Sequence, residues 1–193
     1  MKKTIALLAA LSALALALPA GAKPDNKPAW AGPGLETTIV GTAVALSGGI
    51  EAFDDNTGDF DILVAAVLAT GVNEDILNGS DDYTVFAPTD QAFLDVASSI
   101  ADEEVTDEEA AFGIIAGALG VDGVSAVLAY HVVDGSRPSP SVVNPPNVKM
   151  LDGNTISLDG LEITANNSTA TIIGADVKVA DGFIHVIDAV LMP

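Results

Sequence analysis

The stretch YTVFAPTDQAF, Tyr83–Phe93, contains the transition from strand to helix around which the chain is organised. Its aromatic and β-branched start favours a strand, and Pro88 ends that strand because proline lacks the N–H that a sheet ladder needs. Thr89 then stands where a hydroxyl can accept from the first free N–H groups of a helix, and Asp90 stands where the helix dipole favours an anion. Phe93 begins the apolar face of that helix. A threonine and an acid at such a turn also suggest a catalytic pair, but each residue here has a structural task, so we interpret the stretch as a joint of the fold.

Helices are predicted on both sides of this joint. Apolar residues recur at helical spacing in DFDILVAAVLATG, Asp59–Gly71, and the final glycine marks its end. The segment ETTIVGTAVAL, Glu36–Leu46, is compatible with a helix or a strand, and we favour a helix with Thr37 or Thr38 near its cap. Further helices are predicted at Asp90–Ile100, from about Asp107 to Leu119, and just before a strand near Tyr130–Val133.

Strands are predicted in the last third of the chain. From Val148 onward, short β-branched runs alternate with Asp-Gly and Asn-Asn turns, a pattern typical of hairpins. The preceding segment SRPSPSVVNPPN, Ser136–Asn147, holds four prolines and is predicted to be a loop or an irregular edge. Helices followed by a meander of strands indicate an α+β fold with a mostly antiparallel sheet.

The N-terminus has the features of a secretory signal peptide. Residues 1–22 combine a basic start, a short apolar run and an A-x-A processing site at Ala20–Ala22. The apolar run is too short for a membrane span, which needs about 20 residues, and no other span is predicted. Residues 23–35 form a Pro/Gly-rich linker, and residues 36–193 are predicted to be one domain. We therefore expect a soluble protein that is secreted or periplasmic.

The chain is strongly acidic. Its net charge is −20, from 7 basic and 27 acidic residues, and removal of the two lysines of the signal peptide would leave −22. Such a surface repels phosphate backbones and anionic lipid, so nucleic acid is not expected as a partner. Solubility or a saline habitat accounts for the charge, and divalent-cation binding or cation-bridged adhesion is the alternative.

One acidic stretch, DDNTGDFD at Asp54–Asp61, is similar to a calcium-binding loop. Aligned on an EF-hand loop, however, it places Asp59 at the turn glycine and Ala65 at the bidentate glutamate. We interpret it as a loop that caps the following helix. Weak Ca²⁺ binding stays open as an alternative, and no metal site is predicted.

No catalytic constellation emerges from the sequence. The chain has no cysteine, and its two histidines, His131 and His185, lie in the apolar runs LAYHVV and GFIHVIDAV. We interpret both as hydrogen-bonded core residues, which makes a hydrolase built on either the least favoured function. A phosphate-binding glycine loop and a dinucleotide fingerprint are both absent from the sequence. The expectation is therefore a protein that is not an enzyme, with no catalytic residues and no cofactor.

Three blocks of the sequence resemble the conserved blocks of fasciclin-type domains, in the same order and spacing. They are TVFAPTDQAF (Thr84–Phe93), AYHVVDG (Ala129–Gly135) and DGFIHVIDAVLMP (Asp181–Pro193). The resemblance extends from about Thr38 to Pro193. It implies a helical layer packed on a wedge-shaped, mostly antiparallel β structure, in agreement with the α+β pattern.

The resemblance further implies adhesion or matrix association outside the cell. In animal relatives, a Tyr-His block and an Asp-Ile pair before the last block are implicated in integrin binding. Here the block is Tyr130-His131, and the pair position holds Asp176-Val177, a departure that weakens the inference to integrin. These four residues are the candidate partner-binding residues, although Tyr130 and His131 can equally be core residues that orient the next strand.

The expected partner is a protein or a component of a cell surface or matrix, with self-association and biofilm formation as related roles. Binding of a small apolar ligand or pigment is the alternative function. It is favoured by the apolar core composition and by scattered members of the family.

Overall fold

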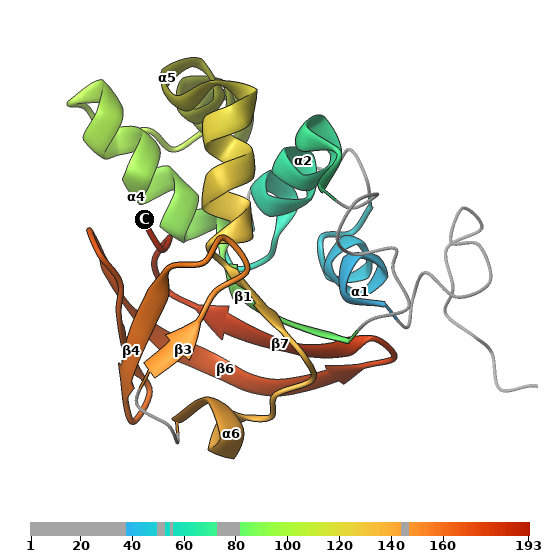
Figure 1. Cartoon of the computed structure of the whole chain (residues 1–193). Helices are drawn as coiled ribbons and strands as arrows, with labels where there is room; N and C mark the ends of the chain where they lie inside the picture. Colours follow the sequence, from blue (N-terminus) through green and yellow to red (C-terminus); the bar gives the residue numbers. More distant parts are fainter. Residues whose placement is uncertain (1–37, 50–52, 55, 73–81, 144–146) are drawn as a thin grey trace, which may run out of the picture.

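The computed structural model describes residues 38–49, 53–54, 56–72, 82–143 and 147–193, which form a helical layer beside a sheet (Figure 1). The predicted signal peptide and linker lie outside the described residues. The helices are α1 (Ile39–Leu46), α2 (Asp61–Thr70), α4 (Asp90–Ala101), α5 (Glu108–Ala129) and α6 (Ser139–Val143). The strands are β1 (Tyr83–Pro88), β2 (Val132–Asp134), β3 (Asn147–Lys149), β4 (Thr155–Asp159), β5 (Glu162–Thr164), β6 (Thr169–Val179) and β7 (Gly182–Ile187).

The described strands form one sheet in the order β2-β1-β7-β6-β5-β4-β3. β1 and β7 run parallel, and every other pair of neighbours is antiparallel. β6 pairs with β5 through its first residues and with β7 through the rest, so it joins the two halves of the sheet. The predicted α+β fold with a mostly antiparallel sheet is confirmed.

β1 is buried on both of its faces. Val85 and Ala87 belong to the core shared with the helices, whereas Phe86 belongs to the core on the other face, as the alternation of side chains along a strand requires. Its parallel partner β7 begins at Gly182, where an added Cβ would lie 1.6 Å from the backbone oxygen of Tyr83. Only glycine allows the two strands to approach so closely.

The turn after β1 differs from the sequence expectation. Thr89 occupies the N-cap position of α4, but its side chain makes no capping hydrogen bond. The carboxylate of Asp90 is fully buried and accepts from the N–H groups of Asp61 (2.9 Å) and Ile62 (2.8 Å) at the start of α2. The N–H of Asp90 in turn donates to the carbonyl of Asp59 at 3.1 Å. The predicted side-chain cap by Thr89 is therefore wrong. Asp90 instead binds the start of α2 to the β1–α4 turn.

α5 consists of two helical pieces. Gly120 has φ 68° and ψ 171°, which are non-helical angles, and it separates the helix predicted to end near Leu119 from the short one that leads towards β2. Among the described residues, α5 is the one helix whose length and apolar composition would suffice to cross a membrane. The helix is broken at Gly120, and it packs against α2 and α4.

The sequence predictions for α1 and for the segment that contains α6 had different outcomes. α1 is the helix that we favoured, and the hydroxyl of Thr38 accepts from the N–H of Gly41 at 3.0 Å as its cap. The sequence predicts a loop or an irregular edge for Ser136–Asn147, but this segment contains the short helix α6. The N–H of Ser139 at the start of α6 donates to a carboxylate on β6, a long-range contact that local sequence does not reveal.

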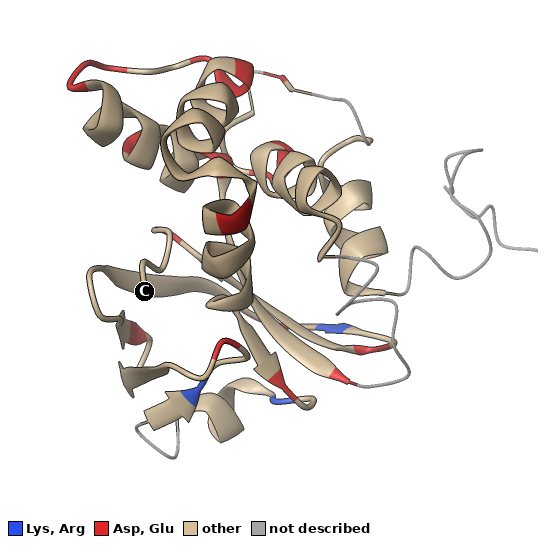
Figure 2. Cartoon of the chain, turned by 45° about the horizontal axis from the view of Figure 1, so that its top comes forward, with Lys and Arg blue, Asp and Glu red and all other residues tan. Residues whose placement is uncertain are grey.

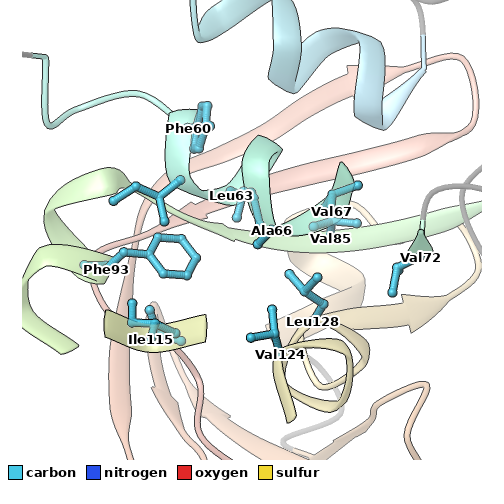
Figure 3. Packing of buried hydrophobic residues seen from close by; sticks show 14 of the residues in the cluster. Phe60, Leu63, Ala66, Val67, Val72, Val85, Phe93, Ile115, Val124 and Leu128 are labelled. Atoms are coloured by element: carbon cyan, nitrogen blue, oxygen red, sulfur yellow. The ribbon is translucent and has the colours of Figure 1, made fainter. Parts of the chain in front are cut away.

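Two hydrophobic cores lie on opposite faces of β1. The first fills the space between the helices and the sheet, where side chains of α2, α4, α5 and β1 converge (Figure 3). Its labelled members include Phe60, Leu63, Val67, Val85, Phe93, Ile115, Val124 and Leu128. The second lies among the strands and includes Phe86, Tyr130, Val133, Val148, Ile156, Ile163, Ile187 and Leu191. The positions of the candidate site residues are therefore described relative to these two hydrophobic cores.

Candidate functional site

Tyr130 and His131 lie in the interior at the end of α5, with exposed fractions of 0% and 2%. The hydroxyl of Tyr130 accepts from the N–H of Asn166 at 3.2 Å. His131 donates from Nδ1 to the carbonyl of Val127 at 2.7 Å, and its Nε2 accepts from the N–H of Leu191 at 2.9 Å. Any role of these two residues in partner binding is therefore indirect, through the segments that they hold.

The contacts of His131 fix its protonation state. A carbonyl can only accept and a backbone N–H can only donate, so Nδ1 carries the hydrogen and Nε2 is bare. Burial lowers the pKa of His131 from 6.5 to about 4, because a charged imidazole would lose its hydration. His131 is thus neutral, and its two hydrogen bonds connect the end of α5 to the last residues of the chain.

Asp176 and Val177 lie at an irregularity of β6, where the pairing with β7 shifts register. Asp176 is exposed and has φ 61°, a left-handed conformation that Asp adopts more readily than most residues other than glycine. Its carboxylate accepts from the N–H and the hydroxyl of Ser139, both at 2.6 Å, and these bonds hold the pKa of Asp176 below its usual value. Val177 is half-buried and pairs with Ile184. The pair therefore presents one exposed acid in a fixed position.

The two candidate pairs are linked through β1 and β7. The N–H of Phe86 donates to the carbonyl of His131 at 2.9 Å, and the Phe86 ring lies 5.7 Å from the ring of His185. His185 Nδ1 accepts from the N–H of Asp176 at 3.2 Å, and its Nε2 donates to the carbonyl of Arg137 at 3.0 Å. His185 is fully buried, as predicted for a central strand.

These contacts also bear on catalysis. Both ring nitrogens of His131 and of His185 are used by backbone groups. A histidine that activates a nucleophile needs one ring nitrogen free to take its proton. Neither histidine offers that nitrogen in this arrangement.

An apolar groove lies between α1, α2, α5 and β1. Its walls include Ile39, Val40, Leu63, Leu68, Leu128 and the ring of His131. It encloses a cavity of only about 40 Å³. Sites for drug-sized ligands usually hold about 300–1,000 Å³, so the groove would have to open to take a pigment.

A third feature is the carboxylate cluster, which we define as Asp54, Asp59, Asp61, Asp90 and Glu108. α2, α4 and α5 each begin here, and the loop before α2 supplies the remaining members. One oxygen each of Asp54, Asp59 and Asp61 lie within 4.8 Å of one another, and so do one each of Asp59, Asp90 and Glu108. Asp59 belongs to both groups and thereby connects them.

Partners are available for only part of the cluster. Beyond the two bonds to Asp90, Asn56 Nδ2 donates to Asp59 Oδ2 at 2.9 Å, and the N–H of Asp54 donates to Glu108 Oε2 at 3.0 Å. Burial is the main cause that raises the pKa of Asp61 to about 6 and that of Glu108 to about 7. Burial, followed by a hydrogen bond with Asp59, raises the pKa of Asp90 to about 8. Ionisation of these carboxyl groups is therefore unfavourable in free energy, because they are buried and close to one another.

Linear spacing did not predict this cluster, because Asp90 and Glu108 come from helices far along the chain from the DDNTGDFD loop. One signal that could have found it is an acid at the first position of three helices: Asp61, Asp90 and Glu108. Each of them is individually explained by the helix dipole. Their convergence depends on how the three helices pack.

Comparison with known proteins gives a consistent result. The sequence profile of the fasciclin domain matches residues 58–193, so the match begins about 20 residues later than the resemblance predicted. Protein sll1483 of Synechocystis sp. is 32% identical over 134 residues, which cover 69% of this chain and 67% of that protein. The cell surface glycolipoprotein MPB83 of Mycobacterium bovis is 31% identical over 119 residues, or 62% of this chain and 47% of that protein.

A solved structure has the same fold. It is a FAS1 domain pair from the insect cell adhesion molecule fasciclin I, and it superimposes with a TM-score of 0.59 at 15% sequence identity. The superposition covers 81% of this chain and 51% of that chain. The predicted helical layer on a β structure is thereby confirmed.

Proposed function

Because this chain belongs to the fasciclin domain family, we propose that it is an exported, non-catalytic module that mediates adhesion to a protein or to a component of a cell surface or matrix. The family match over residues 58–193 is the observation that carries the proposal. Two similar proteins have names that point the same way, since one is a cell surface glycolipoprotein and the other a cell adhesion molecule. The use of all four histidine ring nitrogens by the backbone supports the non-catalytic part.

The proposed contact surface is the corner formed by Asp176, Val177 and the start of α6. Non-glycine residues in left-handed conformations are concentrated at functional sites, where the surrounding structure maintains the strain. Asp176 fits this description, since its backbone N–H and its carboxylate are both held by hydrogen bonds. A fixed, exposed carboxylate is suited to a basic or hydroxyl-rich partner.

Tyr130 and His131 would support this corner from inside. β2 begins directly after them and pairs with β1, and β1 in turn pairs with the strand that holds His185. His185 binds the N–H of Asp176. Changes at Tyr130 or His131 would therefore act on binding through the position of the strands.

One corner on one module provides a single weak contact, so adhesion requires several copies to be presented together. Linking weak sites raises the overall affinity by about 10²–10⁴ when the geometry allows simultaneous contact. Self-association, or display of many copies on one surface, would supply that multiplicity.

The proposal is tested by deleting the protein from its producing cells and measuring attachment and aggregation. We expect both to fall and to recover when purified protein is added back. Unchanged attachment and aggregation, in cells whose parent is shown to export the protein, would contradict the proposal.

A second candidate function is the binding of a small apolar ligand or pigment, because the walls of the groove between α1, α2, α5 and β1 are apolar residues apart from His131. Protein purified from its native host would then carry an organic compound at about one molecule per chain. An organic extract that contains no compound at that ratio, analysed by absorption and mass spectrometry, would rule this function out. The adhesion proposal does not depend on the outcome.

A further inference from the structure

The carboxylate cluster contains buried oxygen atoms that have no hydrogen-bond partner. These atoms are Asp59 Oδ1, Asp61 Oδ1, Asp61 Oδ2 and Glu108 Oε1. Asp59, Asp61 and Glu108 are 6%, 4% and 3% exposed, so water reaches these oxygens poorly. A buried charged oxygen without a partner is costly, and such atoms in a native structure require an explanation. A single kind of ligand, a cation, would satisfy all four of them.

Within the described residues, no basic side chain compensates this charge. The ionisable groups that face the cluster from α2, α4, α5 and the preceding loop are its own carboxylates. The described basic residues are Arg137 between β2 and α6, Lys149 in β3 and Lys178 in β6. Figure 2 shows all Lys and Arg of the described chain in the sheet layer, whereas Asp and Glu lie in both layers.

We propose that the carboxylate cluster binds a divalent cation and that Ca²⁺ is the ion that it fits best. Calcium–oxygen distances are about 2.3–2.6 Å, so two oxygens on the same ion lie no more than about 5 Å apart. Both groups of oxygens in the cluster meet that limit, at 4.8 Å. Each group offers three carboxylate oxygens to an ion, and Asp59 belongs to both groups. The unpartnered oxygens come from Asp59 and Asp61 in the first group and from Asp59 and Glu108 in the second.

The donor set selects the kind of ion. Every available ligand is a carboxylate oxygen, which suits Ca²⁺, Mg²⁺ or Mn²⁺ and disfavours zinc and copper, for which nitrogen and sulfur ligands are preferred. Mg²⁺ requires near-ideal octahedral geometry and retains several waters. The cluster instead supplies many carboxylates at irregular positions, from a loop and three helix starts. Ca²⁺ accepts six to eight oxygens in flexible geometry and matches that supply.

Binding at this place would stabilise the helical layer. The ion would connect the starts of α2, α4 and α5 to the loop that precedes α2, and through Asp90 to the end of β1. Without the ion, these elements are held together despite the repulsion among the carboxylates. We therefore expect a protein whose folding stability rises with Ca²⁺, independently of whether it mediates adhesion.

Calorimetric titration and thermal unfolding of the chelator-treated protein test this proposal. Ca²⁺ in 100-fold excess over its dissociation constant should raise Tm by about 5–10 °C for a domain of this size. Mg²⁺ at the same concentration should have less than half of that effect. No heat of binding and no change in Tm at 10 mM Ca²⁺ would overturn the proposal, and so would equal effects of the two ions, which indicate simple screening of the acidic surface.

Two variants of adjacent residues provide the matched comparison. Glu108→Gln keeps the oxygen that bonds Asp54 but removes one buried charge, so it should raise Tm without Ca²⁺ and weaken Ca²⁺ binding at least tenfold. Glu109→Gln removes the same charge from an exposed neighbour and should change the affinity less than twofold. Asp61→Asn is the second variant should Glu108→Gln fail to fold. Equal losses of affinity for the buried and the exposed variants would refute a specific site.

Discussion

Replacement of His131 by leucine should lower the stability of the protein at neutral pH. Leucine fills much of the same space but makes neither of the two hydrogen bonds of the imidazole, to the Val127 carbonyl at 2.7 Å and the Leu191 N–H at 2.9 Å. Val127 retains another donor, since its carbonyl also accepts from the N–H of Tyr130. Leu191 is fully buried, and its N–H would be left unpaired. We expect the free energy of unfolding at pH 7 to fall by about 1–3 kcal/mol.

The same replacement should also reduce the sensitivity of the protein to acid. His131 has a pKa of about 4 in the folded protein because burial disfavours its charged form, against 6.5 ordinarily. Between these values the unfolded chain binds a proton that the folded protein does not. The stabilisation is therefore complete above pH 6.5 and is lost as the pH falls towards 4. From pH 7 to pH 4.5, the loss due to His131 is about 2–3 kcal/mol.

The assay is urea unfolding of both proteins at pH 7 and pH 4.5 in metal-free buffer, followed by circular dichroism. The informative quantity is the loss of unfolding free energy between the two pH values, compared between the wild type and His131→Leu. Titration of the carboxylates affects both proteins alike and cancels in this comparison. The leucine variant should lose about 2–3 kcal/mol less than the wild type. Equal losses of unfolding free energy in the two proteins would refute the assignment of His131 as a neutral, buried residue.

Three further predictions concern the joint and the glycines, and urea unfolding tests each of them. Thr89→Ala should change the free energy of unfolding by less than about 0.5 kcal/mol, because the side chain makes no cap bond, whereas Asp90→Ala should cost about 1–3 kcal/mol. A larger loss of stability from Thr89→Ala than from Asp90→Ala would support the side-chain cap by Thr89 that the sequence predicted. Gly117→Ala should stabilise the protein by about 0.5–1 kcal/mol. Gly120→Ala, at φ 68°, should destabilise it by about 1–2 kcal/mol. Changes in stability of the same sign for both variants would contradict the break in α5. Gly182→Ala would place a Cβ 1.6 Å from a backbone oxygen of β1 and should cost more than about 3 kcal/mol, so a folded variant of near-normal stability would show that the two strands are not this close.

Features that depend on neighbours in the sequence were predictable. Helical spacing of apolar residues and Gly71 located α2, Pro88 ended β1, and the glycine after Leu119 divided α5. His185 was placed correctly in the core, because both faces of its strand are apolar. These signals act over a few residues, and the packed fold did not override them.

Features that depend on contacts between distant elements were not predictable from local patterns. An acid after a helix cap normally interacts with its own helix, but Asp90 binds the start of α2, about 30 positions earlier in the chain. The exposed position of Asp176 depends on a bulge in β6 and on Ser139 from α6, a helix that the prolines of that segment did not predict. The carboxylate cluster requires three helices to meet, and nothing in the spacing of its residues indicates that they do.

Attachment of cells that lack the protein is the most direct measure of adhesion through the corner at Asp176. Purified wild type, Asp176→Asn and Asp159→Asn would be added back in equal amounts after their equal Tm values are confirmed. Asparagine tolerates the left-handed conformation of Asp176, removes its charge and keeps one of the two oxygens that accept from Ser139. Asp159 is an exposed acid at the end of β4 and serves as the control. We predict that the wild type and Asp159→Asn restore attachment and that Asp176→Asn restores less than half of it. Equal recovery with all three proteins would contradict the role of this corner, and no recovery with any of them would contradict adhesion itself.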